Sequence, residues 1–401
     1  MSGGRHALAV GLCAGLWSAA AAGYEISPNV AVTGNAQIWL TAYEQMEELE
    51  GLYQHPSGDE ATTVTSGFRI NTARVALKLQ TDEQDLSLVT RLRLEDNPGL
   101  LDLYGQYQPA PWFGIRLGQF KVPSVYENLV YARHLDFVTR SRLASALADY
   151  GLSRTTHASS LFHGNRSFQR DLGLALQGEL FGDVLPLRYF AMVGNGLGGG
   201  LFIGGNTKRE YVIANSPGHW FYAGRLEVEP LPGVLTLGGH GSYNLHGDVV
   251  FNSGRTVLDV ERFSASGDIQ LMAEAVGLRG SAAFGGGDIL DDWDDDGRID
   301  FTYYGAEWRA FWCLNPALRA LTGWPRTDDH RVELGFRYDI LVSEQDESDA
   351  ELRQSTYTPA ITYHYLDIVK VQLNALLRRN EQPYQPELED DAYVLAVQGA
   401  L

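Results

Sequence analysis

The chain has 401 residues, of which 44% are hydrophobic, and its formal net charge is −19. This acidic balance argues against nucleic-acid binding, which requires a basic surface. No apolar run reaches the roughly 20 residues that a membrane-spanning helix needs. That excludes a helical membrane protein but leaves open a β-barrel, whose strands alternate apolar and polar residues.

The first 22 residues are predicted to form a cleaved secretory signal peptide. Arg5 supplies its positive charge, residues 7–17 are apolar, and Ala20, Ala21 and Ala22 provide the small side chains of a cleavage site. The alternative is a short buried helix, which would have to bury apolar side chains all round. Residues 23–401 are then the mature chain, predicted to be one outer-membrane barrel.

From residue 30 onward the dominant pattern has a period of two residues. In 86–95, four leucines fall on one face, whereas two arginines and a glutamate fall on the other. Because successive strand side chains point to opposite sides, the leucines should face lipid and the charges a lumen. The predicted lipid-facing leucines are Leu86, Leu88, Leu92 and Leu94. The predicted lumen-lining residues are Arg91, Arg93, Glu95, Arg225, Glu227, Arg309 and Arg337.

Sixteen segments of this kind predict an all-β fold, a sixteen-stranded antiparallel transmembrane β-barrel. An even number of strands lets the last pair antiparallel with the first, so that no edge is left in lipid. Short connections alternate with long ones, as expected for periplasmic turns and extracellular loops; 315–330 is a long stretch on the short side. A soluble protein of several β-sandwiches is the alternative. The segments are 30–43, 67–80, 86–95, 101–108, 113–122, 171–181, 186–194, 219–229, 233–244, 261–272, 276–285, 301–314, 331–341, 356–365, 368–378 and 392–401.

The C-terminal segment keeps its alternation to the last residue. Tyr393, Leu395, Val397, Gly399 and Leu401 share one face. This resembles the C-terminal strand that outer-membrane barrels present to the barrel-assembly machinery, which is therefore an expected partner.

Residues 115–141 read IRLGQFKVPSVYENLVYARHLDFVTRS. They contain a G-x-F-K-x-P pattern and then an F-x-x-R-S element. The segment resembles the phosphate-selective porin O and P family of Gram-negative bacteria, and the resemblance extends more weakly over most of the mature chain. It implies a trimeric outer-membrane porin whose third loop folds into the lumen. The residues that carry it are Gly118, Phe120, Lys121, Pro123, Phe137, Arg140 and Ser141.

The predicted third loop is basic within an acidic chain. Between residues 121 and 170 seven cations face three acids, Glu127, Asp136 and Asp149. A basic constriction would concentrate anions, and arginine binds oxyanions through paired hydrogen bonds. Alternatively, these cations pair with lumen acids such as Glu95, Glu227 and Glu229 and only hold the loop in place. The candidate anion-binding residues are Lys121, Arg133, Arg140, Arg142, Arg154, Arg166 and Arg170.

An acidic run near residue 296 is a candidate calcium loop. Its D-x-D-x-D-G spacing can wrap carboxylates around the ion, but the twelfth position is Tyr303 where an EF-hand needs glutamate. A merely solvated acidic loop is the alternative. The candidate ligands are Asp292, Asp294, Asp296 and Asp300, and calcium is the only cofactor considered.

The sequence as a whole predicts a porin for passive diffusion of small hydrophilic solutes, with anions such as phosphate-like oxyanions preferred. A porin of other selectivity, for cations or small organic solutes, stays open, and so does a barrel enzyme or adhesin. The expected location is the outer membrane of a Gram-negative bacterium, in contact with lipid and lipopolysaccharide. The expected partners are two further copies of the chain, and no nucleic acid.

Overall fold

The structure is a computed structural model. It describes residues 24–43, 67–81, 83, 85–95, 98–149, 170–182, 184–195, 201–202, 220–246, 249–250, 256–257, 260–273, 275–290, 298–322, 329–345, 350–366, 368–381 and 391–400. The predicted signal peptide, residues 1–22, lies outside these ranges.

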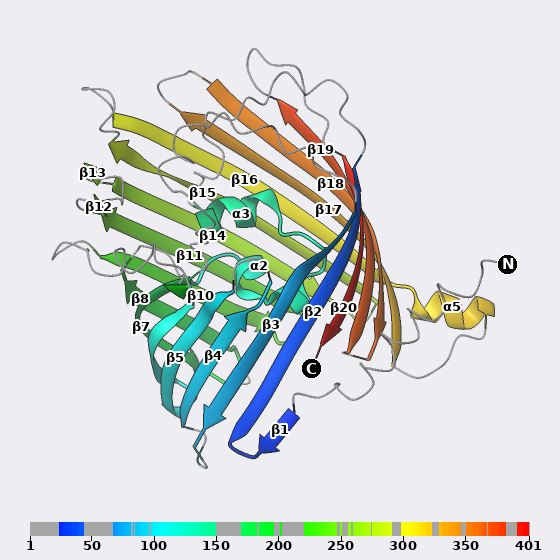
Figure 1. Cartoon of the computed structure of the whole chain (residues 1–401), viewed down its shortest axis with the longest axis horizontal. Helices are drawn as coiled ribbons and strands as arrows, with labels where there is room; N and C mark the ends of the chain where they lie inside the picture. Colours follow the sequence, from blue (N-terminus) through cyan, green and yellow to red (C-terminus); the bar gives the residue numbers. More distant parts are fainter. Residues whose placement is uncertain are drawn as a thin grey trace.

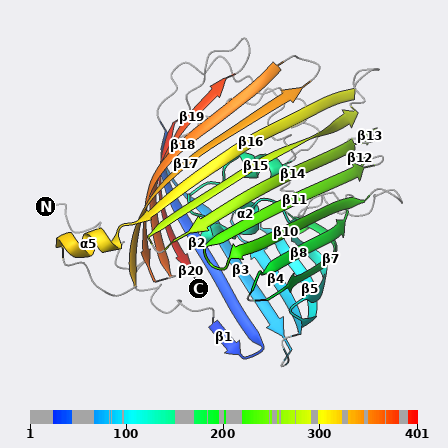
Figure 2. The same ribbon diagram turned by 180° about the vertical axis from the view of Figure 1, so that it is seen from behind.

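Sixteen of the described strands form a closed antiparallel barrel (Figures 1 and 2). Each strand pairs with its neighbour along the chain, and the last pairs with the first through Leu395 opposite Leu40, which closes the wall. The strands are β2 (Val30–Tyr43), β3 (Gly67–Gln80), β4 (Leu86–Arg93), β5 (Gly99–Ala110), β6 (Phe113–Lys121), β7 (Arg170–Leu180), β8 (Leu187–Gly194), β10 (Phe221–Leu231), β11 (Leu235–His246), β14 (Val260–Met272), β15 (Val276–Leu290), β16 (Arg298–Cys313), β17 (His330–Gln345), β18 (Ala350–Tyr365), β19 (Val369–Glu381) and β20 (Ala392–Ala400). The sequence prediction of the fold is confirmed.

Four short strands lie outside this ring. β1 (Tyr24–Ser27) pairs with β2, and β9 (Leu201–Phe202) pairs with the start of β5. β12 (Val249–Val250) and β13 (Thr256–Val257) pair with each other.

The two faces of the wall differ as the alternation predicts. Leu86, Leu88 and Leu94 are exposed on the outside of β4, and so are Trp308 and Trp312 on β16. Residues of the opposite parity point inward, where polar and charged side chains gather. An apolar outer surface is what a lipid bilayer requires of a barrel wall.

The wall is not equally tall all round. We call β4–β8, whose strands have 8 to 12 residues, the short-strand wall. We call β15–β18, with 15 or 16 residues each, the long-strand wall. At ~3.4 Å per residue, the longest strands are roughly twice the length of the shortest.

The described helices lie in two connections. α2 (Tyr126–Leu129), the 3₁₀-helix η2 (Ala132–His134) and α3 (Arg142–Asp149) follow β6 and lie inside the barrel in both views (Figures 1 and 2). α5 (Asn315–Thr322) lies between β16 and β17, in the long stretch that the sequence placed on the short side. Among the described residues, no helix has the length and apolar character needed to span a membrane.

Candidate pore constriction

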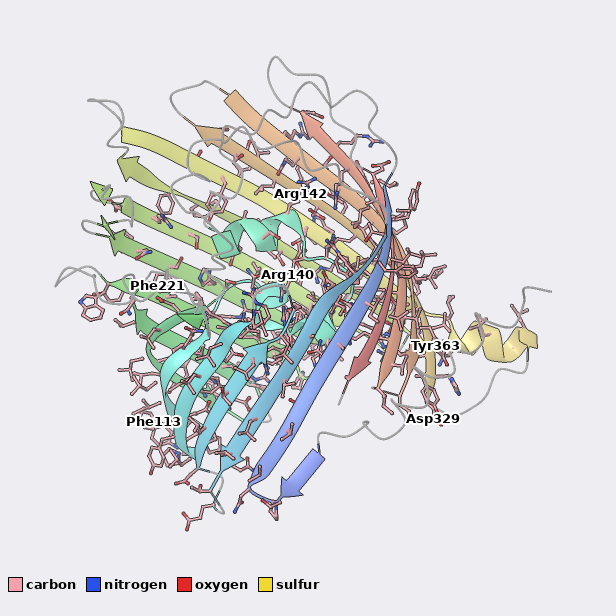
Figure 3. The ribbon with its side chains drawn as sticks, viewed as in Figure 1. Phe113, Arg140, Arg142, Phe221, Asp329 and Tyr363 are labelled. Atoms are coloured by element: carbon pink, nitrogen blue, oxygen red, sulfur yellow. The ribbon has the colours of Figure 1, made fainter. Side chains whose placement is uncertain are left out.

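The connection between β6 and β7, which we call L3, comprises residues 122–169, and its described part ends at 149. Its first half crosses the lumen, so that Arg140 and Arg142 lie within the barrel (Figure 3). Val138 packs with Trp39 and Leu376 in an apolar cluster on the inner side of β2, β19 and β20. An inward-folded third loop narrows a barrel of this size, so L3 is the candidate constriction.

The end of β6 directs the chain inward. Gly118 has a φ of +130°, and a Cβ there would lie 2.2 Å from the carbonyl oxygen of Leu103, so the close approach of β5 requires glycine. Phe120 is fully buried with Tyr104 and Phe190. The G-x-F-K-x-P pattern therefore builds the bend that starts L3.

L3 is held largely by its own backbone carbonyls. The Lys121 ammonium donates to the carbonyls of Asn128, Leu129 and Val130 at 2.8, 3.1 and 2.7 Å. Arg140 donates to the carbonyls of Glu127 and Val130. Because carbonyls are neutral, these contacts satisfy the donors without adding negative charge beside the two cations.

Side chains of β10, β17, β19 and β20 bind the L3 backbone in the same way. Lys370 donates to the carbonyls of Arg133 and Leu135 at 2.9 and 2.8 Å. Other strands contribute single anchors. Four side chains donate to L3 carbonyl oxygens: Arg225 to Ser124, Arg337 to Thr139, Gln372 to Asp136 and Gln398 to Arg133. Two side chains accept from L3 backbone amides: Asn374 from Val138 and Asp339 from Arg142.

Glu127 and Asp136 of L3 point at the long-strand wall. Glu127 is buried, and its carboxylate lies 3.0 Å from Arg309 and 3.7 Å from Arg337. It also accepts from the Ser141 backbone amide and hydroxyl, at 2.9 and 2.6 Å. Both carboxylate oxygens therefore have cationic or hydrogen-bonding partners, as a buried charge needs.

The second acid, Asp136, forms ion pairs with Arg279 and Arg309. The ring of Phe137 beside it packs against Phe311, at 5.7 Å between centroids, with the Arg337 guanidinium 5.0 Å from the ring centre. Glu127 and Asp136 are the L3 acids whose side chains are described, and both are engaged with the long-strand wall rather than with the opposite side of the lumen.

The protonation states follow from these contacts. Burial alone would raise the pKa of Glu127, but Arg309, Arg337 and Arg140 outweigh it and hold that pKa below its ordinary value. The same holds for Asp136. Burial raises its pKa, but the charges of Arg279 and Arg309 lower it by more, so that the pKa of Asp136 lies below its ordinary value. Burial lowers the pKa of the Arg140 guanidinium to about 10, which leaves it charged at neutral pH.

A second group of charges lies where the short-strand wall and its neighbour β3 meet L3, with Arg140 contributed by L3 itself. We call it the basic cluster: Arg74, Arg91, Lys121, Arg140 and Arg170, with the carboxylates Glu95 and Asp102. Asp102 accepts from Arg170 at 2.6 Å and from Arg91 at 3.0 Å, while Arg74 lies 3.3 Å from Glu95. Five cations thus share two carboxylates, a net charge of +3, and they are close enough to repel one another.

The remaining predicted residues are placed as follows. Arg133 donates to the His134 ring at 2.8 Å, and Arg142 donates to the Thr356 hydroxyl at 2.9 Å. Arg154 and Arg166 lie outside the described residues. Of the predicted lumen-lining residues, Arg309 and Arg337 point inward but are covered by L3. Glu227 lies with Glu179 and Glu229 around Arg188, at the end of the barrel where β7 and β8 are joined by a short turn.

The candidate calcium loop is not described. Asp292, Asp294 and Asp296 fall outside the described residues, and Asp300 lies in β16 opposite Asp288. Within the described ranges no three His, Cys, Asp or Glu side chains are grouped so as to hold a metal ion.

Three charged residues of the site were missed by the sequence reasoning. Arg74, Asp102 and Arg279 face inward on β3, β5 and β15. The alternation of inward and outward positions along each strand was the signal that could have found them. It does not show which of the inward charges lie at the level of L3.

Comparison of the sequence with protein-family models and with curated proteins gave no significant match. Solved structures do match. The outer-membrane channel DcaP of Acinetobacter baumannii superposes with a TM-score of 0.54 at 10% identity, covering 95% of this chain and 100% of that one. The anion-selective porin of Comamonas acidovorans gives 0.52 at 11% identity, covering 93% and 99%.

The trimer form of OmpT, an outer-membrane protein of Vibrio cholerae, gives a TM-score of 0.53 at 9% identity and covers 93% of this chain and 99% of that one. At such identities the likeness concerns the fold alone. The chain therefore has the sixteen-stranded barrel fold of outer-membrane porins.

Proposed function

We propose that this chain is a passive diffusion porin of the outer membrane of a Gram-negative bacterium and that it prefers small anions, phosphate-like oxyanions among them. The observation that carries the proposal is the basic cluster. Five cations at L3 face the lumen with two carboxylates between them, whereas Glu127 and Asp136 of L3 are neutralised by the opposite wall. The field at the constriction then attracts anions.

The way the cluster is built favours passage over tight binding. Lys121 and Arg140 donate their hydrogen bonds to backbone carbonyls, so their charge acts on an anion at a distance while their donors are already satisfied. A permeating anion is attracted but not held. We therefore expect conductance to rise without saturation as chloride or phosphate is increased, and phosphate to block chloride only weakly.

The resemblance to the phosphate-selective porin O and P family supports this proposal from the sequence side. The residues that carry it, among them Gly118, Lys121 and Arg140, shape and hold L3. They are therefore evidence for an inward-folded third loop. Membership of that family is proposed on this basis, together with the porin fold.

The test of selectivity is the reversal potential in a salt gradient across a planar bilayer. Arg74 and Arg91 are the variants of choice because neither donates to a carbonyl in the described part of L3, although the Arg91 guanidinium lies 3.5 Å from the ring centre of Tyr131. Arg140→Gln would remove hydrogen bonds to the loop backbone as well as the charge. Wild type should be anion-selective, and the Arg74→Gln/Arg91→Gln double variant should shift toward cations. Arg188→Gln is the matched control, because Arg188 and the three glutamates around it, Glu179, Glu227 and Glu229, lie at the periplasmic end of the barrel, away from L3. A cation-selective wild type, or a double variant with unchanged potential, would overturn the anion preference.

A homotrimer is proposed as the assembly, supported by the fold and by the trimer form of one structural relative. The mass of the purified, unheated protein in mild detergent tests this. Three chains per particle are expected, and a monomer would contradict the assembly but not the pore.

A further inference from the structure

α5 is the element that the pore does not use. It is tied to the barrel at its first residue, where the Asn315 side chain donates to the His330 carbonyl and accepts from the Val332 amide, at 2.5 and 3.0 Å. From there it projects away from the strand ends (Figures 1 and 2). Leu321, in its last turn, is 82% exposed.

The apolar side of α5 continues the outer surface of β16. Trp308 and Trp312 point outward on that strand, with 60% and 45% of their surface exposed. Leu314 has the same parity, and Leu314, Leu318 and Leu321 then follow at the i, i+4, i+7 spacing of one helix side. The apolar positions of β16 thus continue into one side of the helix, where Leu321 is exposed and Leu314 and Leu318 are half-buried.

We infer that α5 lies in the membrane–water interface of the periplasmic leaflet, with Leu318 and Leu321 inserted among phospholipid chains. Tryptophan is enriched at the interface, so the two tryptophans of β16 mark the level at which the strand leaves the hydrocarbon. A short amphipathic helix that starts at this level can lie in the interface plane and insert its apolar side.

This inference rests on the membrane location in the proposed function and not on its anion preference. The two fail separately: the reversal potential tests the preference, and a label on the helix tests its position. A label at the middle of the barrel wall tests the membrane location itself.

The test uses the full mature chain with Cys313→Ser as background, refolded into phospholipid vesicles. Leu321→Cys carries a fluorophore, and the vesicles contain phospholipid with a nitroxide in the upper acyl chain. Arg319→Cys, on the opposite side of the helix by its spacing, is the matched control. Leu226→Cys, on the outer face of β10, reports insertion of the barrel.

The label at 321 should be quenched by the nitroxide about twofold or more strongly than the label at 319, and the order should reverse with aqueous iodide. Quenching of 321 by iodide alone, with 226 quenched by lipid, would overturn the inference and point to a periplasmic partner or to solvent. Self-quenching between labels at 321 without lipid quenching would overturn it in favour of a second copy of the chain. A label at 226 that lipid fails to quench would refute the membrane location.

Discussion

The two walls that flank L3 have opposite electrostatic characters. On the long-strand wall, Arg279, Arg309 and Arg337 meet Glu127, Asp136, Glu307 and Asp339, so every cation has a carboxylate partner. On the other side, four cations of the short-strand wall and β3, together with Arg140 of L3, share two carboxylates. One wall holds the loop, and the other supplies the charge that a solute meets.

The number of arginines alone is therefore a poor guide to selectivity. An arginine whose charge is matched by a carboxylate contributes to the position of L3 and little to the field in the lumen, because the paired charges cancel at a distance. A net charge is left where cations outnumber carboxylates, as in the basic cluster, where Lys121 donates its hydrogen bonds to three neutral carbonyls.

The largest expected effect comes from breaking the pairing on the long-strand wall. Glu127→Gln would leave Arg309 and Arg337 without that carboxylate, and removing one partner of a buried pair costs about 3–5 kcal/mol. L3 should detach, with a lower unfolding temperature and a larger single-channel conductance. Glu229→Gln is the control, since its partner Arg188 is 46% exposed and such pairs contribute ~1 kcal/mol or less. Equal stability of the two variants would show that L3 does not depend on this pair.

The bend that starts L3 gives the next effect. Gly118→Ala would force a side chain into a left-handed conformation and against the Leu103 carbonyl, a strain of about 1–3 kcal/mol before any clash is counted. Gly105→Ala on β5 is the matched control, because nothing lies within 4 Å of its added methyl group. Denaturant unfolding should separate the two, and a neutral Gly118→Ala would mean that the bend is not required.

The contrast between the walls can be tested directly in selectivity. Arg91→Gln removes one positive charge from the basic cluster, and Arg279→Gln removes one from the ion pairs between L3 and the long-strand wall. Because the proposed conducting path runs past the basic cluster, the reversal potential should shift more in Arg91→Gln. The difference between the two variants should fade as salt rises, because the Debye length falls from about 10 Å at 0.1 M to about 3 Å at 1 M. Equal shifts would mean that both walls face the conducting path.

Acid should release L3 from the long-strand wall. The pKa values of Glu127 and Asp136 are lowered in the folded protein from ordinary values of 4.5 and 3.8. A depressed pKa gives stability that is present above the ordinary value and is lost as pH falls through the folded one. Conductance should thus be steady between about pH 5 and 8 and change only below pH ~4. A change near neutral pH would assign the loop's attachment to other groups.

The smallest effect concerns the outer end of the long-strand wall, where 291–297 joins β15 to β16. If this loop binds calcium, the ion should raise the thermal stability of wild type and not of the Asp294→Ala/Asp296→Ala variant. The same response in both proteins would count against the site.

The fold was largely accessible from the sequence because lipid imposes a strict alternation on each strand. The alternation fails where strands extend beyond the bilayer. β17 continues past the predicted 341 through Ser343 and Glu344, whose side chains need not alternate in water. β15 continues through three glycines at 285–287, which have no side chain to mark a face.

The site was only partly accessible. The basic loop and its residues were identified, but the sequence weighed Glu127 and Asp136 against the cations of the same loop. Glu127 pairs with Arg309 and Arg337, and Asp136 pairs with Arg279 and Arg309. These partners lie far along the chain and are brought near by barrel closure and by the crossing of L3. The sequence reasoning also left out Arg74, and it placed Arg91 in the lumen lining without assigning it to the constriction. α5 was likewise seen only as a long connection, because eight residues are too few to establish a helical period.

The carbonyl anchors of L3 bear on how such a pore can diversify. Lys121, Arg140 and Lys370 recognise the main chain of the loop, and every amino acid offers the same carbonyl oxygen. Substitutions at Leu129 or Val130 can alter the side chains without removing these hydrogen bonds. The loop can therefore acquire new side chains over generations while its path across the lumen is inherited unchanged, which makes selectivity evolvable at a small cost in stability.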